Sequence, residues 1–148
     1  MLSEIREVVA EVKRPNRTVL PLLRDYISAN PEIWEELEIV GIKAEEKWID
    51  LLVADRDDLR DGLRNQIDEI RREYWCGGSS PLERLLVDRI VVSWLMVLYF
   101  EAAFAVASEA GLLKQERFFS TQLSRAQRKH GGAVKSLVEV RKLLGGRD

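Results

Sequence analysis

One histidine and one carboxylate in this 148-residue chain are placed where they could transfer protons. His130 is the only imidazole, and Glu101 comes within about one helical turn of its level if the segments that carry them fold back on each other. A carboxylate–histidine pair can act as a proton relay. A buried histidine held by a single hydrogen bond is the competing interpretation, and it is the one favoured here.

An acidic run is the second candidate for chemistry. The string Asp57-Asp58-Leu59-Arg60-Asp61 resembles the D-D-x-x-D magnesium motif of all-helical isoprenoid enzymes. Side chains of Asp57, Asp58 and Asp61 at this spacing can share a divalent ion and hold a pyrophosphate. With the glutamates of 35–38, the run is also similar to the acidic helices of MazG-type nucleotide pyrophosphohydrolases, although their spacing is not met. Acidic residues also favour a helix start, which is the preferred interpretation.

Other catalytic and metal-binding signatures are absent from the sequence. It contains no G-x-S-x-G, no G-x-x-x-x-G-K-[ST] and no H-E-x-x-H. Gln127 stands three residues before His130 where di-iron bundles have Glu. A calcium-binding EF-hand loop beginning at Asp55 is excluded. Its sixth position, which requires Gly, is Arg60, and its twelfth position, which requires Glu, is Gln66. We therefore expect a non-catalytic protein without metal or cofactor.

A strip of basic residues is the stronger functional signal. On a C-terminal helix these residues share the side away from the apolar residues, over about 35 Å at helical rise. Such a strip can contact phosphates, although a charged helix face is more often only solvated. The strip, called the basic ridge below, consists of Arg117, Arg125, Arg128, Lys129, Lys135 and Lys142.

The charges are distributed unevenly along the chain, although the net charge is only −2. Residues 1–80 hold 12 Lys and Arg against 18 Asp and Glu, whereas residues 114–148 hold 9 against 3. This asymmetry predicts either an acidic partner for the basic segment or a contact between the basic helix and the acidic half of the same chain or of another copy.

The elements that position these residues are predicted to be helices arranged around one apolar stretch. Ser80, Pro81 and Glu83 form a capping box with proline at the first helical position, and Gly111 is a suitable terminator. The segment between them has no polar face, so it must be surrounded by protein or by lipid. Asp88, Arg89 and Glu101 interrupt the apolar run, and we expect a buried central helix over about 81–111 and no membrane contact.

The last segment has a heptad pattern that predicts a helix over about 115–144, antiparallel to the central one. A turn near 112–115 places Trp94 beside Ala133 and Val97 beside His130, and Gly131 and Gly132 then let the indole approach the backbone. The same register pairs Arg89 with Glu139, and Asp88 with Arg141 or Lys142. The apolar seam consists of Phe119, Leu123, Ala126, His130, Ala133, Leu137, Val140 and Leu144.

The first half is predicted to contain shorter helices. Ser3–Arg14 and the segment capped by Thr18 are amphipathic, and a longer periodic stretch runs from Glu32 to Leu51. A break or kink is expected at Asp55. The chain is expected to be a single domain over 1–148, with an acidic helical half (1–75), a loop (76–80) and a helical hairpin (81–148).

The location is predicted to be cytoplasmic. Cys76 is the only cysteine, which excludes an intramolecular disulfide and fits a reducing compartment. Residues 1–17 are charged throughout and have no apolar segment of the secretory type. The tryptophans, Trp34, Trp48, Trp75 and Trp94, are expected in the core, and any that is exposed would mark a contact surface.

Strings in the second half carry a resemblance. Residues 81–90, 125–129 and 140–144 (PLERLLVDRI, RAQRK and VRKLL) resemble a recurrent pattern in an uncharacterised family of all-helical bacterial proteins. The size and the basic C-terminal helix are also similar to those of phage and mobile-element accessory proteins, including small terminase subunits. Because this is a likeness of build, it implies no site residues.

The sequence as a whole predicts an all-α antiparallel bundle that serves as an assembly or adaptor subunit. Three hypotheses remain open for its partner. The first is a nucleoprotein complex contacted through the basic ridge. The second is a self-associating protein scaffold without nucleic acid. The third is a small magnesium-dependent enzyme that acts on a (pyro)phosphorylated small molecule through Asp57, Asp58 and Asp61.

Overall fold

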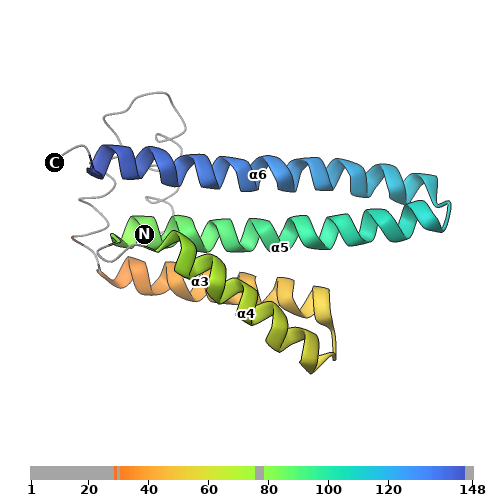
Figure 1. The fold of residues 1–148 in the computed structure, drawn as a ribbon, viewed down its shortest axis with the longest axis horizontal. Coiled ribbons are helices and arrows are strands. Elements are labelled where there is room, and N and C mark those ends of the chain that lie inside the picture. The colour runs from red at the N-terminus through yellow and green to blue at the C-terminus, as the bar shows by residue number, and fades with distance from the viewer. Residues whose placement is uncertain (1–28, 30, 76–78, 146–148) are drawn as a thin grey trace. The chain divides into compact units, whose positions relative to one another are not determined.

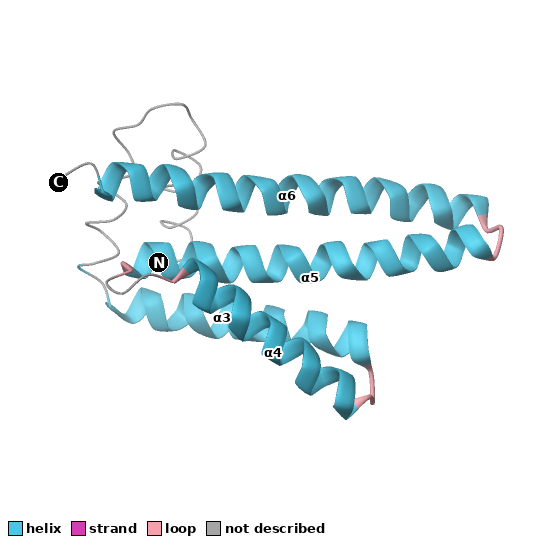
Figure 2. Cartoon of the chain, in the orientation of Figure 1, coloured by secondary structure: helices cyan, strands magenta, loops and turns pink. Residues whose placement is uncertain are grey.

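The all-α prediction is confirmed. The computed structural model describes residue 29 and residues 31–75 and 79–145, and over these it contains four helices and no strand. They are α3 (Pro31–Val53), α4 (Asp57–Tyr74), α5 (Pro81–Glu109) and α6 (Leu113–Gly145). Figure 1 and Figure 2 show α5 between α6 on one side and the α3–α4 pair on the other.

The chain divides into two compact units, Met1–Glu38 and Ile39–Asp148. The helices predicted at Ser3–Arg14 and after Thr18 lie outside the described residues, as do Cys76 and the side chain of Trp34. The second unit contains His130, the acidic run at 57–61 and the basic ridge, so the contacts that follow all belong to it. The count of one domain stays a prediction.

Both ends of α5 form as the sequence predicts. The Ser80 side chain accepts a hydrogen bond of 3.2 Å from the Glu83 backbone, and the Glu83 carboxylate accepts one of 2.6 Å from the Ser80 backbone. At the other end Gly111 has a φ of 69°, which a side chain would strain. Its N–H and that of Leu112 bond the last free carbonyls of the helix, so α5 ends after Glu109 in a Schellman turn.

The first half of α5 carries the core. One buried cluster joins Val91 and Leu95 to Ile49 and Val53 of α3 and Ile67 of α4. A second cluster joins Val87 and Ile90 of α5 to Leu137 of α6. Residues of α5 therefore lie between α6 and α3, so α5 is the central helix.

The cover over α5 is uneven along its length. Beyond Leu95 the only buried residue described in this helix is Ala107, and Val106 is 66% exposed. By length and composition α5 could also cross a membrane, a test that the core helices of water-soluble proteins pass too. The distal half of α5 therefore has an apolar surface that α3 and α4 do not cover.

The break expected at Asp55 is present. The helix α3 ends at Val53, Ala54 has a positive φ of 47°, and α4 starts at Asp57. The residue at the N-cap position is Arg56, and its side chain makes no capping hydrogen bond. The acidic residues Asp57 and Asp58 occupy the first turn instead, where the helix dipole favours negative charge.

The register expected between α5 and α6 is wrong by about one turn. His130 meets Ser93 and Ile90 instead of Val97, and Ala133 packs against the Val87–Ile90 cluster instead of Trp94. The reason is the position of the turn, because α5 ends at Glu109 and α6 starts at Leu113, each two residues earlier than the expected 111 and 115. Each predicted partner on α5 is therefore displaced toward the N-terminus of that helix.

The ion pairs expected across this hairpin change with the register. Asp88 pairs with Arg71 of α4, and Arg141 pairs with Glu83. The close approach that was expected at Gly131 and Gly132 is also wrong, since a Cβ at either position would meet nothing within 4 Å. The structure supplies no packing reason for this glycine pair.

Candidate functional site

The basic ridge lies on the outer face of α6. The heptad seam is confirmed, because Ala126, Leu137 and Val140 are buried and the other seam residues are partly buried. At 100° per residue Arg117, Arg128, Lys135 and Lys142 point away from that seam. All six ridge residues are exposed, including Arg125 and Lys129 to one side. The structure therefore leaves the ridge bare within the described part of the chain.

The ridge cations have no carboxylate partner among the described residues. The ion pairs there use other cations, namely Arg56, Arg60, Arg64, Arg71 and Arg141. Glu46 and Asp50 of α3 pair with Arg60 and Arg64 of α4, and Glu45 of α3 pairs with Arg71. Within the described residues, no ion pair joins the basic ridge to a carboxylate of the acidic half.

Side chains in the ridge and beside it donate hydrogen bonds to carbonyls of their own helix. The Thr121 hydroxyl donates to the Arg117 carbonyl at 3.1 Å, and Arg128 Nε donates to the Ser124 carbonyl at 3.4 Å. Arg128 still has the terminal nitrogens of its guanidinium for a ligand. The neutral side chains of Ser124 and Gln127 are exposed between the cations.

His130 makes structural hydrogen bonds and does not meet Glu101. Its Nδ1 is 3.1 Å from Ser93 Oγ and 3.2 Å from the Ile90 carbonyl oxygen. Because a carbonyl oxygen only accepts, Nδ1 carries the proton. The Ser93 hydroxyl donates to the Arg89 carbonyl at 2.8 Å. Both side chains make hydrogen bonds within the helix pair, where His130 is partly buried.

The acidic run Asp57, Asp58 and Asp61 lies exposed on the first turns of α4. The carboxylate of Asp58 accepts hydrogen bonds from Arg56 at 3.0 and 3.2 Å, which lowers the pKa of Asp58 below its usual value. Among the described residues no group of three or more His, Cys, Asp or Glu side chains comes together as metal ligands would. The geometry thus fits a solvated helix start.

Arg71 forms a charged cluster that sequence reasoning missed. Its guanidinium donates to both carboxylate oxygens of Glu45 and to Asp88, and it thereby ties α4 to α3 and α5. Burial alone would lower the pKa of Arg71, but the hydrogen bond to Glu45 and the charges of both carboxylates raise it overall. The feature of the sequence that indicated this cluster was Asp88, because a charged residue inside an apolar helix needs an ion-pair partner.

A second charged cluster joins the start of α5 to the last turns of α6. Arg141 donates to Glu83 at 3.2 Å and to the Tyr74 carbonyl. Burial would raise the pKa of Glu83, but hydrogen bonds from the backbone and side chain of Ser80 and from Arg141 lower it overall. One carboxylate therefore caps α5 and anchors α6.

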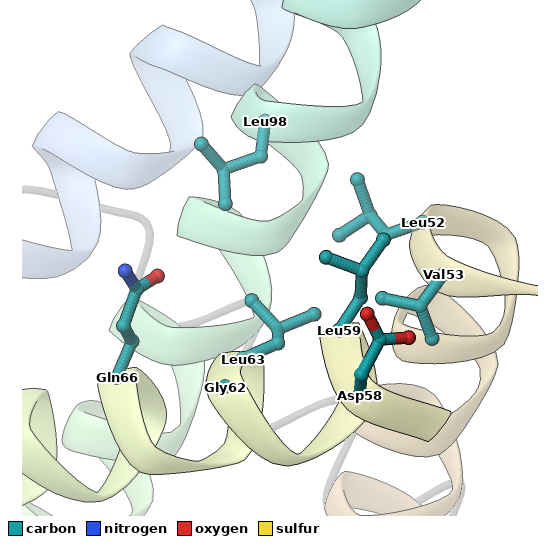
Figure 3. Close-up of a pocket in the computed structure, with 8 residues that line it drawn as sticks. All are labelled: Leu52, Val53, Asp58, Leu59, Gly62, Leu63, Gln66 and Leu98. Carbon is teal, nitrogen blue, oxygen red and sulfur yellow. The ribbon is translucent and has the colours of Figure 1, made fainter. Parts of the chain in front are cut away.

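An open apolar groove lies where the cover over α5 ends, and Figure 3 shows its lining. Leu52 and Val53 come from α3, Leu59 and Leu63 from α4, and Leu98 from α5. Asp58 and Gln66 are the polar side chains at its rim, and the groove encloses about 360 Å³. Sequence reasoning missed this groove, since it forms only where Leu98 of α5 lies beside the end of α3 and the start of α4.

The comparisons with known proteins identify no relative. No family model matches the chain, and neither a curated protein nor a solved structure matches it. The function must therefore be inferred from the ridge, the charged clusters and the groove.

Proposed function

We propose that this protein is a non-catalytic helical assembly subunit that contacts the phosphates of a nucleic acid through the basic ridge of α6. The cytoplasm is the location that fits this role and the single cysteine. The observation that carries the proposal is the exposure of all six ridge cations without a carboxylate partner among the described residues.

The dimensions of the ridge suit a phosphate backbone. Arg117 and Lys142 are 25 residues apart on one helix, which is roughly 35 Å at helical rise. One DNA strand presents about ten phosphates over that length. The proposed contacts run from charged side chains to phosphates, so the binding proposed is independent of sequence.

The experiment measures binding of a labelled 25-base-pair DNA, and of RNA of the same length, by fluorescence anisotropy at several salt concentrations. We expect weak binding that decreases steeply with salt. The triple variant Arg125→Gln, Arg128→Gln and Lys135→Gln should lower the slope of log K against log[salt] by about 2.7, or about 0.9 per phosphate contact.

The matched control removes the same charge from another surface. Arg56, Arg64 and Arg72 are exposed arginines at the start of α4 or within it, and replacing all three by Gln should leave the slope unchanged. The proposal is wrong if neither nucleic acid binds at low salt, or if the control reduces binding as much as the ridge variant does.

A further inference from the structure

The apolar seam of α5 continues beyond the helices that cover it. Positions at steps of three and four share the side that faces α3 and α4. Asp88 on this side pairs with Arg71, and Val91 and Leu95 lie in the core. The positions that follow are exposed at Ala102 and Ala105. The full series is Asp88, Val91, Leu95, Leu98, Ala102, Ala105 and Glu109.

The cover ends because the helices differ in length. The 18 residues of α4 span about 27 Å and the 29 residues of α5 about 43 Å. Figure 1 shows the α5–α6 hairpin extending past the turn between α3 and α4. Small side chains at Ala102 and Ala105, with Val106 beside them, leave a surface that another helix could approach closely. These three residues are called the uncovered strip below.

The two ends of the uncovered strip are complementary. At one end is the apolar groove, with Leu59 exposed beside it and Asp57 and Asp58 at the same helix start. At the other end Leu112 and Leu113 are exposed on the α5–α6 turn, Leu113 by 66%, and the exposed Lys114 follows. One end therefore presents an apolar recess beside Asp57 and Asp58, of which Asp58 also pairs with Arg56. The other presents exposed apolar side chains beside Lys114, which lies between Glu109 and Glu116 in the sequence.

The spacing of these ends fits a second copy of the chain. Leu98 in the groove is 11 residues before the end of α5 at Glu109, or about 17 Å, and Leu112 follows on the turn. If two copies pack their uncovered strips antiparallel about a two-fold axis, each turn reaches the other copy's groove. Every contact is then made twice, as in an isologous dimer.

We propose that a second copy of this chain occupies the uncovered strip and the groove, with Leu112 and Leu113 in the groove and Lys114 beside Asp58. The acidic residues near the groove disfavour an anionic lipid surface as the occupant, and Lys114 is the cation on the turn of the same protein that can meet them. The dimer is independent of phosphate binding by the basic ridge, so either can fail without the other.

The first test measures the mass of the full chain in solution by sedimentation equilibrium over a range of concentrations. We expect a dimer for the natural chain and a monomer for the double variant Ala102→Glu and Val106→Glu, with an unchanged helical circular dichroism spectrum. Val138 is an exposed apolar residue on α6 near its other end, and Val138→Glu should remain dimeric. A dimer that survives in the double variant would contradict the proposal.

A charge exchange distinguishes a specific contact from general damage. Lys114→Glu alone and Asp58→Lys alone should each weaken dimerisation about tenfold, because each places like charges together at two symmetric contacts. The combined variant should restore the natural dissociation constant. A combined variant as weak as the single ones would show that these residues do not meet.

A vesicle experiment gives the remaining contrary outcome. The natural chain is mixed with vesicles of phosphatidylcholine and phosphatidylglycerol and separated by flotation. We expect the protein to stay with the soluble fraction as a dimer. A chain that is monomeric at high concentration and floats with the vesicles would overturn the proposal and assign the strip to lipid.

Discussion

Arg71 shows how a single side chain can organise the contact between three helices. Its guanidinium reaches Glu45 and Asp88, and all three side chains are mostly buried, with 19%, 15% and 28% of each exposed. Partly buried charges lose solvation on folding, so they stabilise the fold only while each has a partner. The cluster therefore fixes how α4 meets α3 and α5 more than it adds net stability.

Removing Arg71 should destabilise the protein strongly. Arg71→Ala leaves two carboxylates without their partner, and we expect the free energy of unfolding to fall by about 2–4 kcal/mol, near the range for breaking a buried pair. Urea unfolding followed by circular dichroism measures it. The neighbouring Arg72 is exposed and bonds only the carbonyl of Asp68, so Arg72→Ala should cost less than about 0.5 kcal/mol. Equal losses would rule out a special role for Arg71.

Glu83 should make stability depend on acid pH. Its pKa is lowered in the folded protein from the ordinary 4.5, so its contribution is present above about 4.5 and is lost as the pH falls through the lowered value. We expect the melting temperature to fall as the pH drops below about 4.5, and Glu83→Gln to flatten part of this decrease. Glu69→Gln, an exposed change on α4, is the control and should keep the full decrease.

At the scale of the element, α5 combines two environments in one uninterrupted helix. Val91 is fully buried beneath α3 and α4, whereas Val106, four turns further along, is mostly exposed. The local sequence is similarly apolar at both places, so periodicity alone does not distinguish them. The difference comes from the lengths of the helices that pack on α5.

The same substitution at these two valines should have different effects. We expect Val91→Ala to lower the free energy of unfolding by on the order of 2 kcal/mol, because it leaves a cavity in the core. Val106→Ala should change it by less than about 0.5 kcal/mol when the chain is dilute enough to be monomeric. Denaturant unfolding at low protein concentration compares them. Equal effects would mean that the cover over α5 differs from the one described.

At the scale of the whole molecule, the two proposed surfaces use different parts of the second unit. The basic ridge lies on α6 opposite its seam, and the uncovered strip lies on α5. The ridge cations have no ion-pair partner among the described residues, so the small net charge of −2 conceals a basic surface on α6. Salt dependence reports on the ridge and sedimentation on the strip.

The sequence by itself determined the helices of the second half and the residues that start and stop α5. Ser80, Pro81, Glu83 and Gly111 act through contacts within one turn of the chain, and such local contacts are readable from residue type and spacing. The buried face of α6 was also readable, because its seam repeats at every turn. The exposure of the basic ridge on the opposite face follows from that repeat.

The tertiary structure alone decided which residues meet. A turn placed two residues earlier than expected moved His130 from Glu101 to Ser93 and gave Arg141 to Glu83. Asp88 meets Arg71 of α4 instead of a basic residue of α6. Register depends on the exact position of a turn, and sequence patterns fix such boundaries only to within a few residues. The groove and the uncovered strip depend on where α3 and α4 stop beside α5. That position follows from how the helices pack, and the sequence of each segment alone does not show it.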